Sequence, residues 1–199
     1  MRSAKGRWQW ALAVVLGLVA IGPANGAETL ALAKPQPGEG TLKPGLGVKY
    51  VPWEFNHVDE VLQIAKSNKP RVGTPLPMLN YNVGAGKVLT SDNTDLIGAL
   101  IDGFIKLPKP GDYKFTIQHN DGVRFFLAGK KIYENPGVTA DVFSPHLEIK
   151  VTEAGWYPLS MVYFEKRNTA TLELYWQGPD DDDFKFVPAE NFAHDPTKE

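Results

Sequence analysis

The 199-residue sequence contains no cysteine, which excludes disulfide bonds and a lipid anchor on an N-terminal cysteine. Its stability must therefore come from a packed core. A basic excess is also absent, because 21 Lys and Arg residues stand against 23 Asp and Glu residues. This balance argues against a nucleic-acid partner, which requires clustered positive charge. The four histidines lack the spacing of a zinc site, and no nucleophile or phosphate-binding motif is present.

Long apolar runs are absent except near the N-terminus, where residues 1–26 have the three parts of a secretory signal peptide. Residues 2–7 carry positive charge, residues 10–21 are apolar, and residues 24–26 are small. The alternative is an uncleaved membrane anchor, but the apolar run is shorter than the ~20 residues that span a bilayer. We therefore expect cleavage before Ala27, export to the periplasm or the extracellular space, and no membrane span after signal removal.

Proline and glycine are frequent in the next part of the chain. Residues 27–44 alternate the two, a composition that cannot continue a helix or join a sheet interior, and they predict a linker or an extended arm. The folded domain is expected over residues 45–195, followed by a tail over residues 196–199. Early in this domain, apolar residues in the segment 56–66 recur at helical spacing, and Asn56 is the expected N-cap.

Strand patterns dominate after a long early loop that we expect at residues 67–87. Residues 96–107 are apolar in both registers, as in a strand covered on both faces, whereas residues 113–119 alternate apolar and polar side chains. Further strand patterns, separated by turn signals, occur at residues 123–129, 146–151, 157–165 and 170–177. Short strands at this spacing predict an all-β, antiparallel sandwich or barrel.

Three longer segments follow one another in a specific order. They are GLGVKYVPWEF at 45–55, IGALIDGFIKLPKPGDYKFTIQHNDGVRFFLAGKKIYENPG at 97–137, and EAGWYPLSMVYFEKRNTATLELYWQGP at 153–179. Together they resemble the PA14 domain, a module of toxins, fungal adhesins, glycosidases and bacterial secreted proteins, over residues 45–195. The resemblance implies an antiparallel two-sheet β-sandwich.

The resemblance also implies a ligand site at Asn120 and Asp121. In the adhesin branch of the family, two adjacent aspartates joined by a cis peptide hold calcium, and the ion receives sugar hydroxyls. Asn120 and Asp121 stand at the equivalent positions, and Glu165 or Asn168 is the counterpart of a third ligand. Because position 120 holds an asparagine instead of the first aspartate, this ligand set has one negative charge fewer than in the adhesins. Calcium affinity depends on the charge of the ligands, and Glu165 can restore the missing charge.

The same Asn120-Asp121-Gly122 sequence has a purely structural alternative. These residue types tolerate positive φ and bond to their own backbone, as a tight hairpin connection requires. Asp180 to Asp183 form the densest charge in the chain, and we expect a solvated turn there. Among the aromatic residues, Trp156 and Trp176 are expected to be structural, whereas Trp53 or Tyr81 would be better platforms for a sugar.

These observations lead to one leading hypothesis and two alternatives. The leading hypothesis is an exported, non-catalytic module that binds carbohydrate or another extracytoplasmic ligand through Asn120, Asp121, Glu165 and Asn168. Calcium is the candidate cofactor, with Asn120, Asp121 and Glu165 as its ligands. The first alternative is a structural or protein-interaction module that binds an envelope protein without a metal. The second is a small glycan-active hydrolase, for which paired carboxylates are the only indication.

Overall fold

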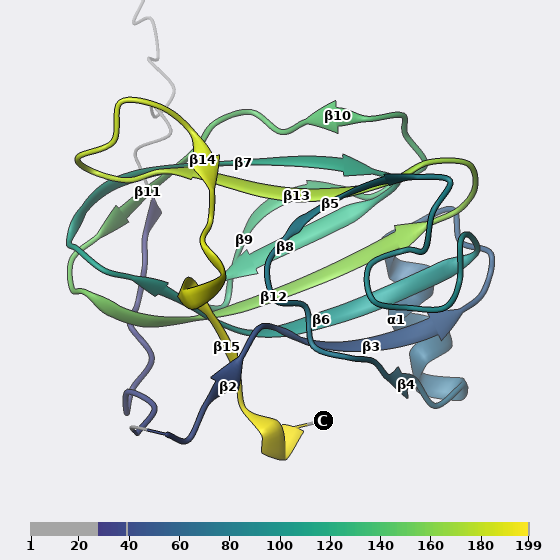
Figure 1. Cartoon of the computed structure of the whole chain (residues 1–199), viewed down its shortest axis with the longest axis horizontal. Helices are drawn as coiled ribbons and strands as arrows, with labels where there is room; N and C mark the ends of the chain where they lie inside the picture. Colours follow the sequence, from purple (N-terminus) through teal and green to yellow (C-terminus); the bar gives the residue numbers. More distant parts are fainter. Residues whose placement is uncertain (1–27, 39, 199) are drawn as a thin grey trace, which may run out of the picture.

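Two β-sheets face each other in the computed structural model, which describes residues 28–38 and 40–198 (Figure 1). The seven-stranded sheet contains β1 (Glu28–Thr29), β5 (Asn80–Gly84), β7 (Gly111–Asn120), β10 (Val142–Phe143), β11 (Leu147–Val151), β13 (Ala170–Gln177) and β14 (Lys185–Phe186). The eight-stranded sheet contains β2 (Lys43–Pro44), β3 (Gly47–Pro52), β4 (Arg71–Val72), β6 (Ile97–Leu107), β8 (Val123–Leu127), β9 (Lys130–Asn135), β12 (Gly155–Glu165) and β15 (Phe192–His194). The helices are α1 (Val58–Ser67) and two 3-10 turns, η1 (Ala189–Asn191) and η2 (Pro196–Lys198).

The pairing of the strands confirms the predicted antiparallel β-sandwich. Strand β7 lies between β11 and β13, and β12 lies between β6 and β8, in both cases with antiparallel register. The exception is β1, which pairs with β11 in parallel. None of the helices in the described ranges is long and apolar enough to cross a bilayer.

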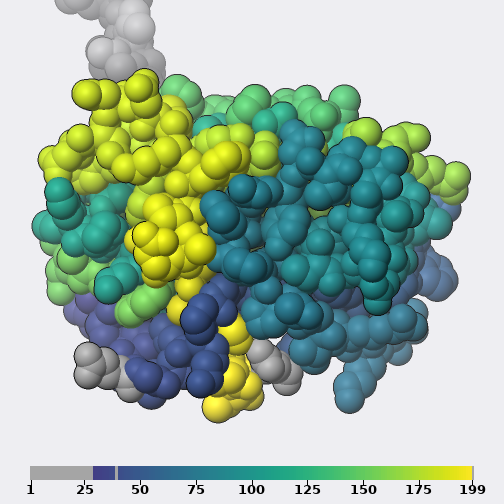
Figure 2. Space-filling view, viewed as in Figure 1, coloured from purple at the N-terminus to yellow at the C-terminus, as the bar shows by residue number. Residues whose placement is uncertain are grey.

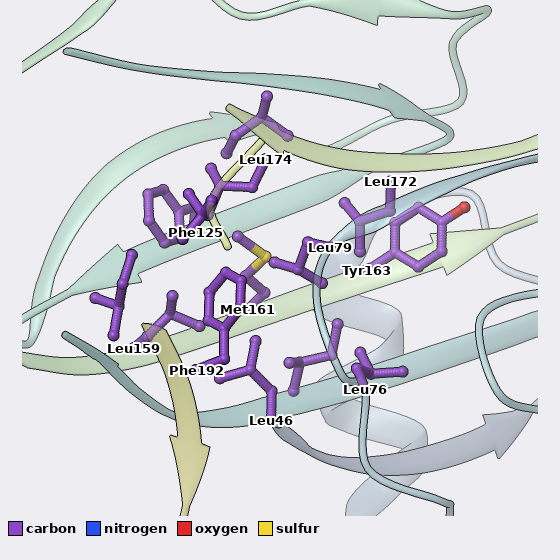
Figure 3. Packing of buried hydrophobic residues seen from close by; sticks show 14 of the residues in the cluster. Leu46, Leu76, Leu79, Phe125, Leu159, Met161, Tyr163, Leu172, Leu174 and Phe192 are labelled. Carbon is purple, nitrogen blue, oxygen red and sulfur yellow. The ribbon is translucent and has the colours of Figure 1, made fainter. Parts of the chain in front are cut away.

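The core fills the space between the sheets, as the close view in Figure 3 shows. The predicted alternation in residues 113–119 is confirmed for the inner face, because Tyr113, Phe115 and Ile117 are buried in the core. On the opposite face Lys114 is exposed, but Thr116 is buried and donates its hydroxyl to the Ser144 carbonyl. Phe125 and Met161 of the eight-stranded sheet belong to the same buried cluster. Each such side chain contributes about 1.5–3 kcal/mol when it is fully removed from water.

One end of the outer face of the eight-stranded sheet is covered by α1, which accounts for the apolar residues Gly98 and Leu100 on the outer register of residues 96–107. Phe55, Val61 and Phe164 form a second buried cluster there, and an added Cβ on Gly98 would lie only 2.7 Å from Val61. The predicted helix is present, but its N-cap is His57 rather than Asn56. His57 has extended backbone, and its Nδ1 accepts a hydrogen bond from the Asp59 amide at 3.1 Å.

Two segments expected to lack regular structure contribute short strands. Residues 67–87, predicted as a long loop, include β4 and β5, and this part of the chain covers one side of the sandwich beside the C-terminal segment (Figure 2). Residues 27–44, predicted as a linker or arm, include β1 and β2, and Leu30 is buried in the main core. The predicted signal peptide, residues 1–26, lies outside the described residues.

Candidate functional site

The Asn120-Asp121-Gly122 segment connects the two sheets, so the alternative that it forms a hairpin turn is wrong. Asn120 ends β7 in one sheet, whereas β8, which follows, pairs with β9 and β12 in the other. The segment is tied to β12, because the Asp121 amide donates to the Phe164 carbonyl at 3.2 Å and the Phe164 amide donates to the Gly122 carbonyl at 3.1 Å. The peptide bond between Asn120 and Asp121 is cis.

Asp121 is almost fully buried, with 3% of its surface exposed, and both carboxylate oxygens accept backbone hydrogen bonds. Oδ1 accepts from the Thr139 amide and Oδ2 accepts from the Lys166 amide, each at 2.9 Å. Burial raises the pKa of Asp121, and these two amides oppose the rise. The carboxylate therefore joins the loop after β9 to the loop after β12 and is held in one orientation.

Asn120 is held from both its side chain and its backbone. The amide nitrogen donates to the Thr169 hydroxyl at 3.1 Å, and the backbone carbonyl accepts from the Tyr163 hydroxyl at 2.6 Å. With the nitrogen bound to Thr169, the amide oxygen is the atom of this side chain that can serve a ligand.

His119 supports the segment from inside the sandwich. Its Nδ1 lies 2.6 Å from the Asp121 carbonyl and its Nε2 lies 3.1 Å from the Tyr133 hydroxyl. Because the carbonyl only accepts, Nδ1 carries the proton and Nε2 accepts from the tyrosine. Burial lowers the pKa of His119, which favours this neutral form.

Glu165 is fully buried at the end of β12, with 0% of its surface exposed. Neither carboxylate oxygen has a hydrogen-bond partner of normal geometry within the described residues. Burial and the negative charges of Asp121 and Asp95 raise the pKa of Glu165 to about 9, although the Arg167 backbone amide opposes this rise. The side chain is therefore neutral at pH 7 in the protein alone. Its two oxygens lie next to Asp121 without a hydrogen bond of normal geometry.

An open pocket of about 580 Å³ lies over Asn120 and Asp121. Its remaining walls come from the loops after β9 and β12, namely Val138, Thr139, Ala140, Lys166, Arg167, Asn168 and Thr169. Asn168 is thus placed in the pocket, where it adopts a positive φ of 85° and donates its backbone amide to Asp95 at 2.9 Å. Glu165 does not line the pocket; it lies behind this wall.

Two cationic side chains on the pocket wall are bound to partners on the neighbouring loop. The Lys166 ammonium donates to the Asn56 amide oxygen at 2.7 Å. The Arg167 guanidinium contacts both carboxylate oxygens of Glu54 at 3.2 and 3.3 Å. The Glu54 carboxylate offsets part of the positive charge that both residues bring to the rim, because it also lies 3.9 Å from the Lys166 ammonium.

The donor chemistry around Asp121 fits a hard cation such as calcium. The Asp121 carboxylate, the Asn120 amide oxygen and the unpartnered Glu165 carboxylate are all oxygen donors, the type that calcium prefers. Between residues 28 and 198, apart from residue 39, no three acidic or histidine side chains are already gathered as a complete metal cluster. A cation would therefore bring these oxygens together rather than enter a preformed cage.

The other acidic candidate, the Asp180 to Asp183 segment, lies in a salt-bridged loop. Asp180 pairs with Lys109 at 2.5 Å and Asp181 pairs with Lys185 at 2.6 Å. Asp181 also accepts the Gly178 amide at 3.0 Å, which fixes the turn. These contacts satisfy two of the carboxylates locally.

The aromatic candidates differ in exposure. Trp176 is buried in the core, and Trp156 is half-buried with the Lys106 ammonium over its ring. Tyr81 is also half-buried, and burial raises its pKa to about 12. Trp53, by contrast, exposes 52% of its surface.

Three residues of the site had no sequence signal that identified them. Thr139 and Thr169 are ordinary loop residues in the sequence, yet each holds one member of the Asn120-Asp121 pair. Asp95 lies between the predicted early loop and the strand pattern of residues 96–107, and it holds the backbone of Asn168. Their roles depend on loops from distant parts of the chain that meet only in the folded state.

Comparison with known proteins identifies the architecture. The family model of the PA14 domain matches residues 80–188, which is more than half of the chain. No curated protein matches the chain in sequence.

Three solved structures illustrate the likeness, each at an identity that shows the fold alone. The PA14 domain of the MpAFP antifreeze protein is 13% identical with a TM-score of 0.65, covering 81% of this chain and 96% of that one. The PA14 sugar-binding domain from an RTX adhesin is 15% identical with a TM-score of 0.60, covering 76% and 98%. The Epithelial Adhesin 9 A domain from Candida glabrata, in complex with Galb1-3GlcNAc, is 12% identical with a TM-score of 0.64, covering 85% and 97%.

Proposed function

The chain belongs to the PA14 domain family, and on that premise we propose that it is an exported, non-catalytic module that binds carbohydrate. The ligand site is the pocket over Asn120 and Asp121, with Asn168 on its wall. The domain covers residues 45–195 together with β1, Leu30 and β2 of the preceding arm, which pair with its sheets or pack in its core. A signal peptide over 1–26 precedes it. The location is the periplasm or the extracellular space.

The observation that carries this proposal is the unpartnered carboxylate of Glu165 beside Asp121. A buried acidic side chain whose two oxygens lack a hydrogen bond of normal geometry is costly, because burial disfavours its charge and the Arg167 backbone amide opposes this effect only in part. A divalent cation held between Asp121, which lines the pocket, and Glu165, which lies behind it, would satisfy these oxygens. The same cation would balance the charge of Asp121, which burial now disfavours.

Different residues of the site have different roles in binding a cation and a sugar. Asp121, fixed by the Thr139 and Lys166 amides, and Asn120, fixed by Thr169, present oxygens in one orientation. Glu165 contributes the second negative charge after it loses its proton. Calcium, when bound, offers coordination positions to vicinal sugar hydroxyls.

Two further points support a binding role rather than catalysis. A glycosidase needs two carboxyl groups that face the substrate on opposite sides of the scissile bond, whereas Asp121 is the one acidic side chain among the residues that line this pocket. Two of the similar structures are a sugar-binding domain from an RTX adhesin and an adhesin domain in complex with Galb1-3GlcNAc.

A calcium titration of the chain purified from residue 27 onward tests the proposal. We expect the melting temperature to rise with calcium concentration, because a cation that binds only the folded state stabilises it. Glu165→Gln should remove most of this rise, and at neutral pH it should raise the metal-free melting temperature, because Glu165 releases a proton on unfolding and glutamine does not. Asp182→Asn, in the remote acidic loop, is the matched control and should respond like the wild type.

Glycan binding is then measured on an array with calcium and with a chelator. Binding that requires calcium, and that Glu165→Gln weakens, supports the full mechanism. Binding that is indifferent to the chelator would keep the carbohydrate function and reject the metal. The absence of both calcium stabilisation and glycan binding would overturn the proposal and favour the envelope-protein interaction module.

A further inference from the structure

Trp53 lies at the same end of the sandwich as the pocket. Strands β3, β7 and β12 all run toward this end in Figure 1, and Trp53 directly follows β3 just as Lys166 directly follows β12. The Trp53 amide donates to the Leu96 carbonyl at 2.9 Å, and the Leu96 amide donates to the Lys166 carbonyl at 3.2 Å. The sheet's hydrogen-bond ladder thus continues past the strand ends from Trp53 to the pocket wall.

This ladder fixes the separation of Trp53 from the pocket. Neighbouring strands lie about 4.8 Å apart, so two steps across the sheet place the Trp53 backbone about 10 Å from that of Lys166. One sugar ring does not bridge this span, whereas an oligosaccharide does. Trp53 is therefore outside the pocket itself and within reach of a longer ligand.

The surface between the two points is built from side chains that can bond hydroxyl groups. Arg167 lines the pocket, and its guanidinium pairs with Glu54, the residue next to Trp53. Lys166 and Asn56 form a second polar pair at the same place. These groups supply both hydrogen-bond donors and acceptors along the path from the pocket to Trp53.

The exposure of Trp53 separates it from the other tryptophans of the described domain. It exposes 52% of its surface, whereas Trp176 is buried and Trp156 is half-buried beneath Lys106. Single exposed apolar residues are common on protein surfaces. The distinguishing observation is that Trp53 follows β3 at the ligand end, next to Glu54, whose carboxylate pairs with Arg167 of the pocket wall.

We propose that Trp53 forms a second sugar subsite, and that the ligand is an oligosaccharide extending from the pocket across the Arg167–Glu54 pair to the indole. This inference rests on the proposed carbohydrate function and specifies its ligand as a chain of two or more rings. The indole contributes by stacking on the apolar face of a sugar ring. Trp53 thereby determines ligand length rather than calcium affinity.

Paired measurements with short and long saccharides test this subsite. The probes are galactose, glucose, mannose and N-acetylglucosamine, each as the monosaccharide and as a tetrasaccharide, titrated in calcium by calorimetry. We expect Trp53→Ala to weaken tetrasaccharide binding about tenfold and to leave monosaccharide binding and calcium stabilisation unchanged. Trp53→Phe should recover part of the loss, because it retains an aromatic face.

The control variant is Phe143→Ala, which removes an aromatic side chain that is 55% exposed on the other sheet. It should bind both saccharide lengths like the wild type. The subsite is rejected if the wild type binds the monosaccharide and the tetrasaccharide with equal affinity. It is also rejected if Trp53→Ala lowers the affinity for both saccharides equally, or for neither. In each of these cases the carbohydrate function stands. If wild type binds none of the probes, the proposed function fails for them, and this inference fails with it.

Discussion

The Tyr163 hydroxyl donates a hydrogen bond to the Asn120 carbonyl across the interior of the sandwich, at 2.6 Å. Tyr163 belongs to β12 in one sheet and Asn120 ends β7 in the other. The bond therefore holds the two sheets together at the point where the ligand pocket begins.

Replacing Tyr163 with phenylalanine should destabilise the fold by about 1–3 kcal/mol, because the buried Asn120 carbonyl would lose this donor. Urea denaturation measures the change as a lower midpoint at constant slope. Tyr175→Phe is the comparison, since its hydroxyl bonds to Glu173 at a half-buried position on the outer face. Equal effects of the two substitutions would contradict the importance assigned to the inter-sheet bond.

The stability of the metal-free protein should depend on pH through Glu165. Its pKa is about 9 in the folded protein and near 4.3 in an unfolded chain. Between these values the folded state retains a proton that the unfolded state has lost, so stability falls as pH rises. The contribution has a slope of at most about 1.4 kcal/mol per pH unit.

Denaturation of wild type and Glu165→Gln across pH 5 to 9 isolates this contribution, because glutamine does not titrate. We expect the wild type to lose stability relative to the variant as pH increases. Parallel pH curves for the two proteins would show that Glu165 titrates in the folded state as it does in the unfolded one.

Gly122→Ala should destabilise the protein by about 2 kcal/mol or more, a cost typical of overpacking a tight interior. An added Cβ would lie 2.3 Å from the Phe164 ring and 2.8 Å from the Pro136 carbonyl oxygen. Gly137→Ala is the matched control, since its nearest contact there is at 4.0 Å. Thermal denaturation distinguishes them, and a Gly122 variant as stable as the control would refute the close packing of this crossover.

Leu30→Ala should cost about 2–5 kcal/mol, the range for truncating a buried leucine. Only 3% of Leu30 is exposed, although the residue lies in the predicted arm. Thr29→Ala, at the exposed neighbouring position, should change stability by less than about 0.5 kcal/mol. A negligible effect of Leu30→Ala on chemical denaturation would mean that the arm does not contribute to the stability of the domain.

The sandwich could be predicted from the sequence because alternation within a strand is a local property. Tyr113, Phe115 and Ile117 show this directly, since their period of two matches the buried face of β7. The N-cap was wrong by one residue, because both Asn56 and His57 can accept an amide hydrogen and only the fold determines which does. Short strands such as β4 and β5 escape prediction, since their pairing partners rather than their own composition form them.

The position of Asn120 and Asp121 in a pocket followed from the family resemblance, whereas their surroundings did not. The local sequence is compatible with a hairpin, and only the pairing of β8 with β12 makes it a crossover between sheets. The partners Thr139 and Lys166 come from loops 18 and 45 residues away. Contacts over such separations leave no periodic signal in a single sequence.

The pairing of β1 with β11 determines how the domain can be displayed. Residues 28 and 29 lie beside β11 near the start of β7, whereas the pocket lies at its end, roughly 25 Å farther along the strand. A tether on the N-terminal side of β1 would thus be attached far from the pocket. On a surface, such an attachment would orient the pocket outward, so that a bound glycan need not approach the anchoring side.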